Sequence, residues 1–570
     1  MKKYACLPFP ATAVLILLSV FCFFSVGCGS VEEREVPVFV VTTEAPGYSA
    51  ERVEATVTMP LERELAGLHT KVQAVSSAGK SVITVFAVNV TDSLIYGIRG
   101  CISRAALPDG AASPRLEHYI DPRYAMRYTL QSDAYTPAEL LRWHESVLAA
   151  EFARVPGVRR VFSVGGRREC RTVVSDLSLL KKYGVDINAF TDAVENGLAN
   201  TDFRVPAAAD LPGMAIAPGV LLKDLARVDL SPCDGPGSVA KDRDDGLPEG
   251  IVVFDGRQSG EEMAAAFFSV LENIKKAHPR VSVTPFYTGC AKGGGQIAGR
   301  QLRVWFSPGT DRAQKAAFCA ETRALLGSVP GVRSVVSETG FSLNGYAVEE
   351  QAATFYIVTD GKTDVETALR EKLRPSDRAV YRFLPVSEGD GSAVRYIRIS
   401  GPDRMESLRA LRAVRDDLSA MAGISAICDE SGGETPTTEY VIRHEEAARH
   451  GVSLSGVMRA VEAVSGGKTW VTDGFPVRME LLPGQAEKID TYPLLKVHGK
   501  WIGLPQVSEK RVHTVPAVLR RENGQPYTEL VFTAADAQAV RAVEERFGDP
   551  ASRPASIPRE AVIEIGKAVY

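Results

Sequence analysis

After its first thirty residues the sequence has no long apolar run. Between Val36 and Tyr570, no apolar segment approaches the roughly eighteen residues that a membrane-spanning helix needs. We therefore expect no bundle of transmembrane helices in this part of the chain. Its 570 residues, 45% of them hydrophobic, should instead form several globular domains, because one core rarely organises so long a chain.

Charge of one sign is not in excess either. The sequence holds 66 lysine and arginine residues against 70 aspartate and glutamate residues, and both signs are mixed along its length. A protein that binds nucleic acid would show a basic face or stripe. The composition therefore argues against a nucleic acid partner.

Motifs for catalysis and for cofactors are missing. Residues 78–81 (AGKS) and 467–469 (GKT) resemble the end of a phosphate-binding loop, but Ala74 and Glu462 stand where that motif requires glycine. Neither a Gly-x-Ser-x-Gly elbow nor a His-Glu-x-x-His pair occurs. We expect no enzyme activity and no cofactor.

No cysteines or histidines have the spacing of a metal site. His444 and His450 lie six residues apart on an expected helix, which separates them around its axis, so we interpret them as surface residues. The scattered cysteines after Cys28 are expected to be buried thiols, or to form one or two disulfides of an exported protein, rather than to bind metal. They are Cys101, Cys170, Cys233, Cys290, Cys319 and Cys428.

The N-terminus does carry an apolar segment. Residues 1–3 (MKK) precede a nearly unbroken hydrophobic run over residues 11–26, as is typical of an export signal peptide. Cys28 follows small residues that resemble a bacterial lipobox, although Ser25 replaces the preferred leucine, and we predict that Cys28 is acylated. The alternative is an uncleaved anchor, because the run is also about long enough to cross a bilayer as one helix. Either way, the rest of the chain should lie outside the cytoplasm, on the periplasmic face of the cell membrane.

Two halves of the chain resemble each other. Residues 155–158 (VPGV) lead through a glycine pair to residues 180–185 and a helical pattern. Residues 421–424 (MAGI) lead in the same way to residues 447–452. The offset is 266 residues at the first glycine and 267 at the last, so one inserted residue accounts for the difference.

The same small unit recurs elsewhere. Residues 326–332 also join a helical pattern to an alternating strand, and residues 66–68 before the strand at 72–77 form a weaker copy. Four such units predict four small α/β subdomains of an α+β protein. The glycine-rich residues 289–296 between the halves are interpreted as a linker.

Local signals predict two of the helices. Thr136 and Glu139 form a capping box around a proline at the first helical position. Ser49 is a plausible N-cap of an earlier helix that Pro60 should kink. The apolar stripe of this earlier helix consists of Val53, Val57, Leu61 and Leu65.

At this point the residues resemble the resistance, nodulation and division (RND) superfamily of efflux transporters, in its multidrug (AcrB-like) and heavy-metal branches. Residues 46–62 are similar to the opening of the first porter subdomain. The most specific match is residues 502–507 (IGLPQV) followed by 520–525 (RRENGQ), which look like the exit from a docking domain and the re-entry into the last porter subdomain. Further matches in family order are residues 75–85, 107–114 and 307–332.

The resemblance implies a duplicated porter architecture of small split-βαβ (ferredoxin-like) sandwich subdomains with two inserted docking subdomains. Residues 1–28 would be the signal or anchor, and 289–296 would replace a transmembrane bundle. The first half would comprise porter subdomain 1 (36–120), porter subdomain 2 (121–170 and 250–288) and a docking subdomain (171–249). The second half would comprise porter subdomain 1 (297–390), porter subdomain 2 (391–435 and 515–570) and a docking subdomain (436–514).

No substrate-binding residue can be assigned. Methionines bind soft cations in the heavy-metal branch, but their spacing here does not gather them, so we interpret them as ordinary core or surface residues. These are Met405, Met421, Met458 and Met479. Four aromatic residues flank the expected first-half porter sheet and could line an apolar cleft, although core packing is the preferred interpretation. These are Tyr124, Tyr128, Phe286 and Tyr287.

The expected function is that of a membrane-tethered, extracytoplasmic porter and docking component of an RND-type efflux system. Without the intramembrane proton relay of the family, such a chain would not couple proton flow by itself. Its expected partners are an energised RND transporter, a periplasmic adaptor or an outer-membrane channel, and the family implies a homotrimer. The alternatives are a free-standing periplasmic lipoprotein that binds a hydrophobic ligand or metal in the porter cleft, and a decayed pump remnant.

Overall fold

The computed structural model describes most of the chain after residue 34. Among the residues that it describes, no helix is both long enough and apolar enough to span a membrane. Cys28, Cys290 and nearly all of the segment 289–296 lie outside the described residues. The described residues are 35–108, 110–166, 168–199, 211–233, 237–289, 299–306, 310, 312–361, 367–368, 372–373, 379–384, 394–401, 403–429, 434–465, 468–472, 475–554, 557 and 560–567.

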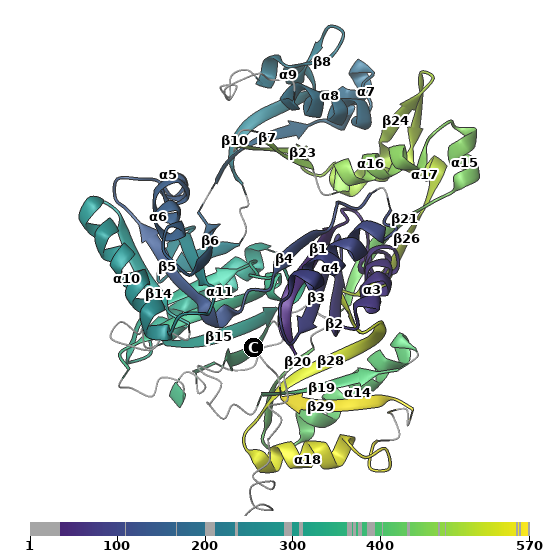
Figure 1. Cartoon of the computed structure of the whole chain (residues 1–570). Coiled ribbons are helices and arrows are strands. Elements are labelled where there is room, and N and C mark those ends of the chain that lie inside the picture. The colour runs from purple at the N-terminus through teal and green to yellow at the C-terminus, as the bar shows by residue number, and fades with distance from the viewer. Residues whose placement is uncertain are drawn as a thin grey trace, which may run out of the picture.

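A nine-stranded antiparallel sheet contains strands from both ends of the described chain (Figure 1). Its two parts join where Gln73 lies opposite Glu522 and Ser77 lies opposite Val518. The order is β29 (Val562–Lys567), β19 (Val394–Ser400), β28 (Gln525–Ala534), β27 (Val518–Glu522), β2 (Val72–Ser77), β3 (Lys80–Ala87), β1 (Val36–Glu44) and β4 (Arg115–His118), with β20 (Ile424–Asp429) also paired to β28.

The helix predicted after Ser49 packs on this sheet. It consists of α2 (Ala50–Val53), a π-helical turn (Glu54–Thr58) and α3 (Met59–Leu65), and the Ser49 side chain accepts the N–H of Arg52 at 3.3 Å. All four residues of the predicted stripe are fully buried. Pro60 lies in the first turn of α3, where the N–H group that proline lacks is not required. The helix is therefore not broken at Pro60, and its irregular part is the wide π-helical turn directly before α3.

Three further helices cover the nine-stranded sheet. Helix α4 (Asp92–Arg104) lies beside α3, and its buried Ile98 joins the same core. Helices α14 (Arg404–Ala420) and α18 (Ala537–Phe547) cover the part formed by β19, β28 and β29. These helices therefore cover two separate cores, one at each end of the sheet.

A four-stranded antiparallel sheet is the second layer of the molecule. Helix α5 (Pro137–Trp143) covers it and begins with the predicted capping box, in which Thr136 and Glu139 exchange hydrogen bonds. A π-helical turn (His144–Leu148), α6 (Ala149–Ala153) and α10 (Gly260–Ala277) complete the helical face. The strand order is β14 (Ser282–Tyr287), β5 (Ala125–Gln131), β13 (Pro248–Phe254) and β6 (Val158–Gly165).

A six-stranded sheet packs against the four-stranded one through a shared apolar core. Helices α11 (Arg312–Gly327) and α12 (Ala347–Glu350) belong to it. Its strand order is β12 (Asp244–Asp245), β11 (Ser238–Lys241), β16 (Val332–Thr339), β17 (Ala352–Thr359), β15 (Gly299–Phe306) and β18 (Ala379–Leu384). Strands β11 and β12 come from the first half of the chain, so the sheet joins the two halves.

A fourth region, at the top of Figure 1, has one core built from both halves. Strands β7 and β23 pair in parallel at its centre, in the order β10 (Ala226–Cys233), β7 (Arg168–Ser175), β23 (Phe475–Leu481) and β22 (Lys468–Thr472). Its helices are α7 (Leu177–Tyr183), α8 (Ile187–Ala199), α9 (Leu222–Leu225), α15 (His444–Arg449), α16 (Leu454–Ser465) and α17 (Leu504–Val507). Two-stranded sheets pair β21 (Glu434–Ile442) with β26 (Ser508–Pro516), β24 (Pro493–Val497) with β25 (Lys500–Gly503), and β8 (Ala215–Ala217) with β9 (Val220–Leu221).

The repeated glycines take equivalent backbone conformations. Gly157, Gly331 and Gly423 each have a positive φ, of 82°, 88° and 77°, between a helix and the strand that follows it. Gly184 and Gly451 follow α7 and α15 with φ values of 73° and 68°. A left-handed residue ends a helix most easily when it is glycine, which explains the sequence repeat.

The weaker copy of this unit differs in one respect. His69, with φ of 52°, is the left-handed residue before β2, and Gly67 does not have a positive φ.

The mixed α+β class with several antiparallel sheets is confirmed. The finer division into porter and docking subdomains remains a prediction.

Candidate functional site

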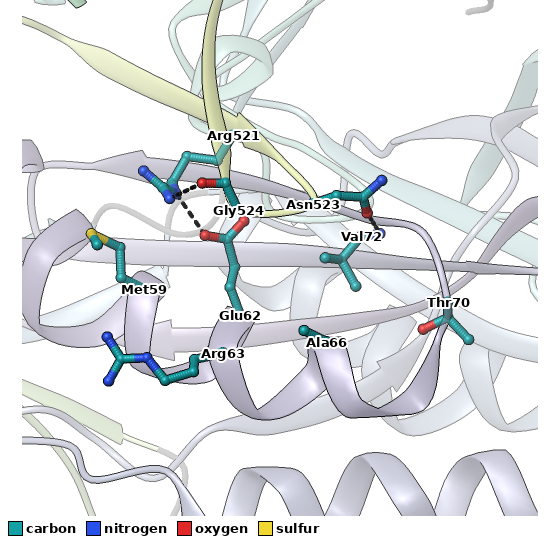
Figure 2. A pocket seen from close by; sticks show the side chains of 9 residues that line it. All are labelled: Met59, Glu62, Arg63, Ala66, Thr70, Val72, Arg521, Asn523 and Gly524. Atoms are coloured by element: carbon teal, nitrogen blue, oxygen red, sulfur yellow. Dashed lines mark hydrogen bonds and ion pairs between the residues drawn. The ribbon is translucent and has the colours of Figure 1, made fainter. Parts of the chain in front are cut away.

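A cavity of about 330 Å³ opens between α3 and the turn that joins β27 to β28 (Figure 2). Figure 2 shows Glu62 and Arg521 pointing toward each other across it, although 459 residues separate them in sequence. The cavity therefore exists only in the folded chain. Its lining residues are Met59, Glu62, Arg63, Ala66, Thr70, Val72, Arg521, Asn523 and Gly524.

A two-residue turn forms one wall of the cavity. Glu522 pairs with Gln525, and between them Asn523 and Gly524 have φ values of 48° and 80°. An Asn-Gly pair suits such a hairpin turn, because both of its central residues need a positive φ. The Asn523 N–H donates to the Val72 carbonyl, and the Val72 N–H donates to Asn523 Oδ1, each at 2.9 Å. These two bonds hold the turn against β2.

A buried ion pair crosses the cavity. Arg521 donates its Nε–H to Glu62 Oε2 at 2.6 Å and a second N–H to the Gly524 carbonyl. The side chains of Glu62 and Arg521 are 4% and 11% exposed. Burial raises the pKa of Glu62, and this outweighs the hydrogen bond and charge of Arg521 and the backbone N–H of Gly524, which lower it.

Two more charges extend this pair. Arg521 Nη1 lies 3.6 Å from Glu54 Oε1, and the Glu54 carboxylate accepts two N–H bonds from Arg404, each at 2.5 Å. Two carboxylates and two guanidinium groups balance in charge. We call Glu54, Glu62, Arg404 and Arg521 the seam cluster, because it links the π-helical turn and α3 to β27 and α14.

A second buried charge cluster links the four-stranded and six-stranded sheets. Arg127 Nη1 donates to Glu249 Oε1 at 2.8 Å and also to Glu338 Oε2, and the three side chains are 6%, 0% and 6% exposed. The Tyr356 ring lies 5.1 Å from the Arg127 guanidinium. Burial, followed by the neighbouring charge of Glu338, raises the pKa of Glu249 well above its ordinary value, against the effect of Arg127. We call Arg127, Glu249 and Glu338 the sheet cluster.

The residues that resembled a phosphate-binding loop have another role. Residues 78–79 form the hairpin turn between β2 and β3, residues 80–81 begin β3, and Lys80 pairs with Glu350 at 2.8 Å. Gly467 lies outside the described residues. His444 and His450 are both exposed at the ends of α15, as expected of surface residues.

The four methionines lie apart. Met479 is fully buried in the core shared by β7 and β23, Met458 packs against the α2 to α4 core, and Met421 packs against the core under α14. Met405 is 53% exposed. The described residues hold no group of three or more His, Cys, Asp or Glu side chains that could bind a metal ion.

The four aromatic residues pack in cores. Tyr128 is fully buried, and its hydroxyl bonds His144 Nε2 at 2.7 Å; Tyr124 packs against the same core. Phe286 and Tyr287 lie between the two sheets, with ring centroids 5.1 and 5.4 Å from that of Tyr356. The cavity in Figure 2 has none of these residues in its lining.

The cysteines that the structure describes are buried or disulfide-bonded, as expected of residues with a structural role. Cys101, Cys319 and Cys428 are buried cysteines, and Cys170 is disulfide-bonded. The side chain of Cys233, like Cys290, lies outside the described residues.

Glu62 and Arg521 were not singled out from the sequence, yet both lie in segments that carry the family resemblance. Residues 46–62 and 520–525 are far apart in sequence and meet at the seam cluster. The sequence offered one weak signal, which is that Glu62 directly follows Leu61 of the buried stripe. Helical spacing alone does not decide whether a residue at that position is buried or exposed.

Comparison with known proteins agrees with the resemblance. The model of the AcrB/AcrD/AcrF family matches residues 10–203. Multidrug resistance protein MdtC of Erwinia tasmaniensis is 29% identical over 206 residues, which are 35% of this chain and 20% of that protein. The cobalt-zinc-cadmium resistance protein CzcA of Cupriavidus metallidurans is 27% identical over 212 residues, or 33% of this chain and 20% of that protein. The match thus spans about a fifth of the length of these relatives.

The similarity in fold covers more of the chain than the similarity in sequence. A crystal structure of a heavy metal efflux pump superimposes with a TM-score of 0.78 over 97% of this chain and 82% of that chain, at 16% sequence identity. These relatives are transport proteins, so the expectation of a non-enzymatic chain is confirmed. The chain is thus related to the RND efflux pumps, by sequence over its first third and by fold over nearly all of its length.

Proposed function

We propose that the chain is an extracytoplasmic, membrane-tethered porter and docking component of an RND-type efflux system. The observation that carries the proposal is the fold correspondence with a heavy metal efflux pump over 97% of the chain. In this proposal the chain works beside a separate energised RND transporter, a periplasmic adaptor or an outer-membrane channel.

Cysteine chemistry supports an extracytoplasmic location. Cys170 is disulfide-bonded, and disulfides persist in oxidising compartments such as the periplasm. We propose that acylated Cys28 provides the tether and that the single N-terminal apolar helix is the alternative anchor.

The region with β7 and β23 supports the proposed docking part. Its core combines residues of both proposed docking subdomains, 171–249 and 436–514, although β11 and β12 of the first subdomain lie in the six-stranded sheet. We propose that this region makes the contacts between subunits of a homotrimer or with a channel.

The experiment is chemical cross-linking in intact cells of the producing organism, followed by mass spectrometry of the proteins that co-purify. The expected result is an energised transporter, adaptor or channel, cross-linked through residues 171–249 or 436–514. A control with a lysine removed far from this region, Lys275→Gln on the exposed face of α10, should give the same partners.

Recovery of the protein alone would contradict the proposal. If Cys28 were then found acylated, the result would favour a free-standing lipoprotein that binds a hydrophobic ligand or metal. Saturable thermal stabilisation of the protein by such a ligand would separate this alternative from a pump remnant.

A further inference from the structure

We propose that the sheet cluster is a proton-binding site, in which Glu249 and Glu338 share one proton at neutral pH. We further infer that release of this proton loosens the junction between the four-stranded and six-stranded sheets. The ligand of the site is the proton itself. The proposal goes beyond the proposed function and does not depend on it, because all the groups concerned lie within one chain.

The charges of the sheet cluster do not balance. Arg127 provides one guanidinium group, whereas Glu249 and Glu338 provide two carboxyl groups, and all three side chains are at most 6% exposed. A buried charge without a counter-charge is strongly unfavourable. One proton on the carboxyl pair leaves a single negative charge, which the guanidinium group balances.

Other charged groups near this junction have partners of their own. Arg303 of β15 lies in the same cross-strand row as Glu338 and pairs with Glu349 at 3.7 Å. Lys241 of β11 donates to an amide side chain at 3.2 Å. Among the described residues, Arg127 is therefore the only cation that pairs with either carboxyl group of the cluster.

The remaining titratable groups around Glu249 are neutral near pH 7. The Tyr356 ring of β17 lies 5.1 Å from the Arg127 guanidinium, and burial raises the pKa of its hydroxyl well above the ordinary value. Burial also raises the pKa of Tyr128 on β5, and it lowers the pKa of His144 to about 4. None of these groups adds a positive charge that could replace the proton.

Hydrogen bonding also calls for a proton. Glu249 Oε1 accepts an Arg127 N–H at 2.8 Å, but Oε2 is a buried atom without a hydrogen-bond partner among the described residues. The Glu249 and Glu338 carboxyl groups lie within hydrogen-bonding reach, a contact that adds to burial and to the charge of Glu338 in raising the pKa of Glu249. Two carboxylates have no donor between them, so this contact requires a proton.

One neighbouring hydroxyl does not change this conclusion. Thr129 lies opposite Glu249 on β5, and its buried Oγ1 is likewise without a partner in the part of the chain that the structure describes. A bond from this hydroxyl to Glu249 would leave the excess negative charge in place, because threonine is uncharged.

The proton lies where two sheets meet. Glu249 is on β13 of the four-stranded sheet and Glu338 is on β16 of the six-stranded sheet, and residues of both sheets form one shared apolar core. With the proton, the two carboxyl groups are joined by a hydrogen bond. Without it, two carboxylates repel each other in a buried place, and separation of the sheets relieves this repulsion.

Infrared spectroscopy of the full chain tests for the proton directly, because a protonated carboxyl group absorbs at a higher frequency than a carboxylate. At pH 7, the wild type should show one such band that Glu249→Gln lacks. Glu272→Gln, which removes an exposed carboxyl group on α10, is the matched control and should keep the band. Any band from Glu62, whose pKa burial also raises, cancels in the difference between the proteins. No difference between the wild type and Glu249→Gln would overturn the proposal.

Alkaline titration of the same band tests the effect on the junction. Once the band is lost, amide hydrogens in peptides that cover β13 and β16 should exchange at least about tenfold faster in the wild type than in Glu249→Gln at the same pH, because only the wild type then buries an uncompensated charge. At pH 7 the two proteins should exchange alike. A band that persists to pH 10, or equal exchange after its loss, would overturn the inferred loosening.

A second variant keeps the test decisive. Glu338→Gln also leaves one carboxylate for Arg127, so it should lack the band and exchange slowly at alkaline pH, as Glu249→Gln does. The unfolding temperature at pH 7 shows that each variant folds, and Glu338→Gln takes the place of Glu249→Gln if the latter does not. A band retained in the folded variant would place the proton elsewhere and reject the proposal.

Discussion

Arg521 and Glu62 form a buried ion pair at 2.6 Å that joins β27, in the last third of the chain, to helix α3. The side chains of Glu62 and Arg521 are 4% and 11% exposed, so removing either one leaves the charge of its partner buried. Breaking a buried pair costs more than the pair contributes, because one charge stays behind.

Arg521→Ala should therefore lower the free energy of unfolding by about 3 kcal/mol. The loss is measured by denaturant unfolding at pH 7. The matched control is Arg104→Ala, which breaks the pair between Arg104 and Glu64, whose side chains are 61% and 31% exposed. That change should cost much less, because solvent screens the exposed pair. Equal losses in the two variants would show that burial does not determine the value of the pair.

The sheet cluster predicts a pH dependence. Because the pKa of Glu249 is raised in the folded protein, its stabilising contribution is fully present below the unfolded pKa and is lost as pH rises through the folded pKa. Glu249→Gln should therefore lose less stability than the wild type between pH 5 and pH 8, as measured by unfolding temperature. Glu272→Gln on the exposed face of α10 should keep the wild-type profile. A steeper decline in Glu249→Gln would contradict the assignment.

His144 predicts the opposite slope in acid. Burial lowers the pKa of His144 to about 4, and its ring bonds Tyr128 and Ser163. Its contribution is present above pH 6.5 and is lost as pH falls toward 4, in total about 3 kcal/mol. His144→Gln should flatten the loss of stability over this window, and exposed His450→Gln should not. Unfolding followed by circular dichroism at pH 4.5, 5.5 and 6.5 tests both.

The Asn523-Gly524 turn allows the effect of backbone conformation to be isolated. A Cβ added at Gly524 or at Gly67 would meet no atom within 4 Å, but only Gly524 has a positive φ, of 80°. Gly524→Ala should therefore cost about 1 kcal/mol, and Gly67→Ala should be neutral or slightly stabilising. Denaturant unfolding of the two variants under one set of conditions is the measurement. The same effect in both would mean that φ at Gly524 is not the cause.

Local patterns predicted local structure well. Ser49, the buried stripe of α2 and α3, and the strand at 72–77 were all readable because caps, helical spacing and alternation act over a few residues. In the weaker copy of the repeated unit, the left-handed residue is His69 rather than the glycine that the stronger copies use, because a weak repeat does not determine the register of a turn to one residue.

The candidate site could not be predicted in the same way. Glu62 is separated from Arg521 by 459 residues, and no spacing in the sequence connects them. The same holds for the pairing of β2 with β27 and of β7 with β23, which set the layout of the sheets. The family resemblance ordered these segments along the chain but did not show which of their side chains meet.

The pairing of β2 with β27 has a consequence for how the chain folds during its synthesis. Until residues 518–522 are available, one edge of β2 lacks the partner that it has in the folded protein, and an open strand edge readily pairs with other chains. Because so distant a contact closes slowly, the segment that holds β2 must be shielded from aggregation until residues 518–522 have been made. Chaperones should therefore matter more to the yield of this protein than its final stability suggests.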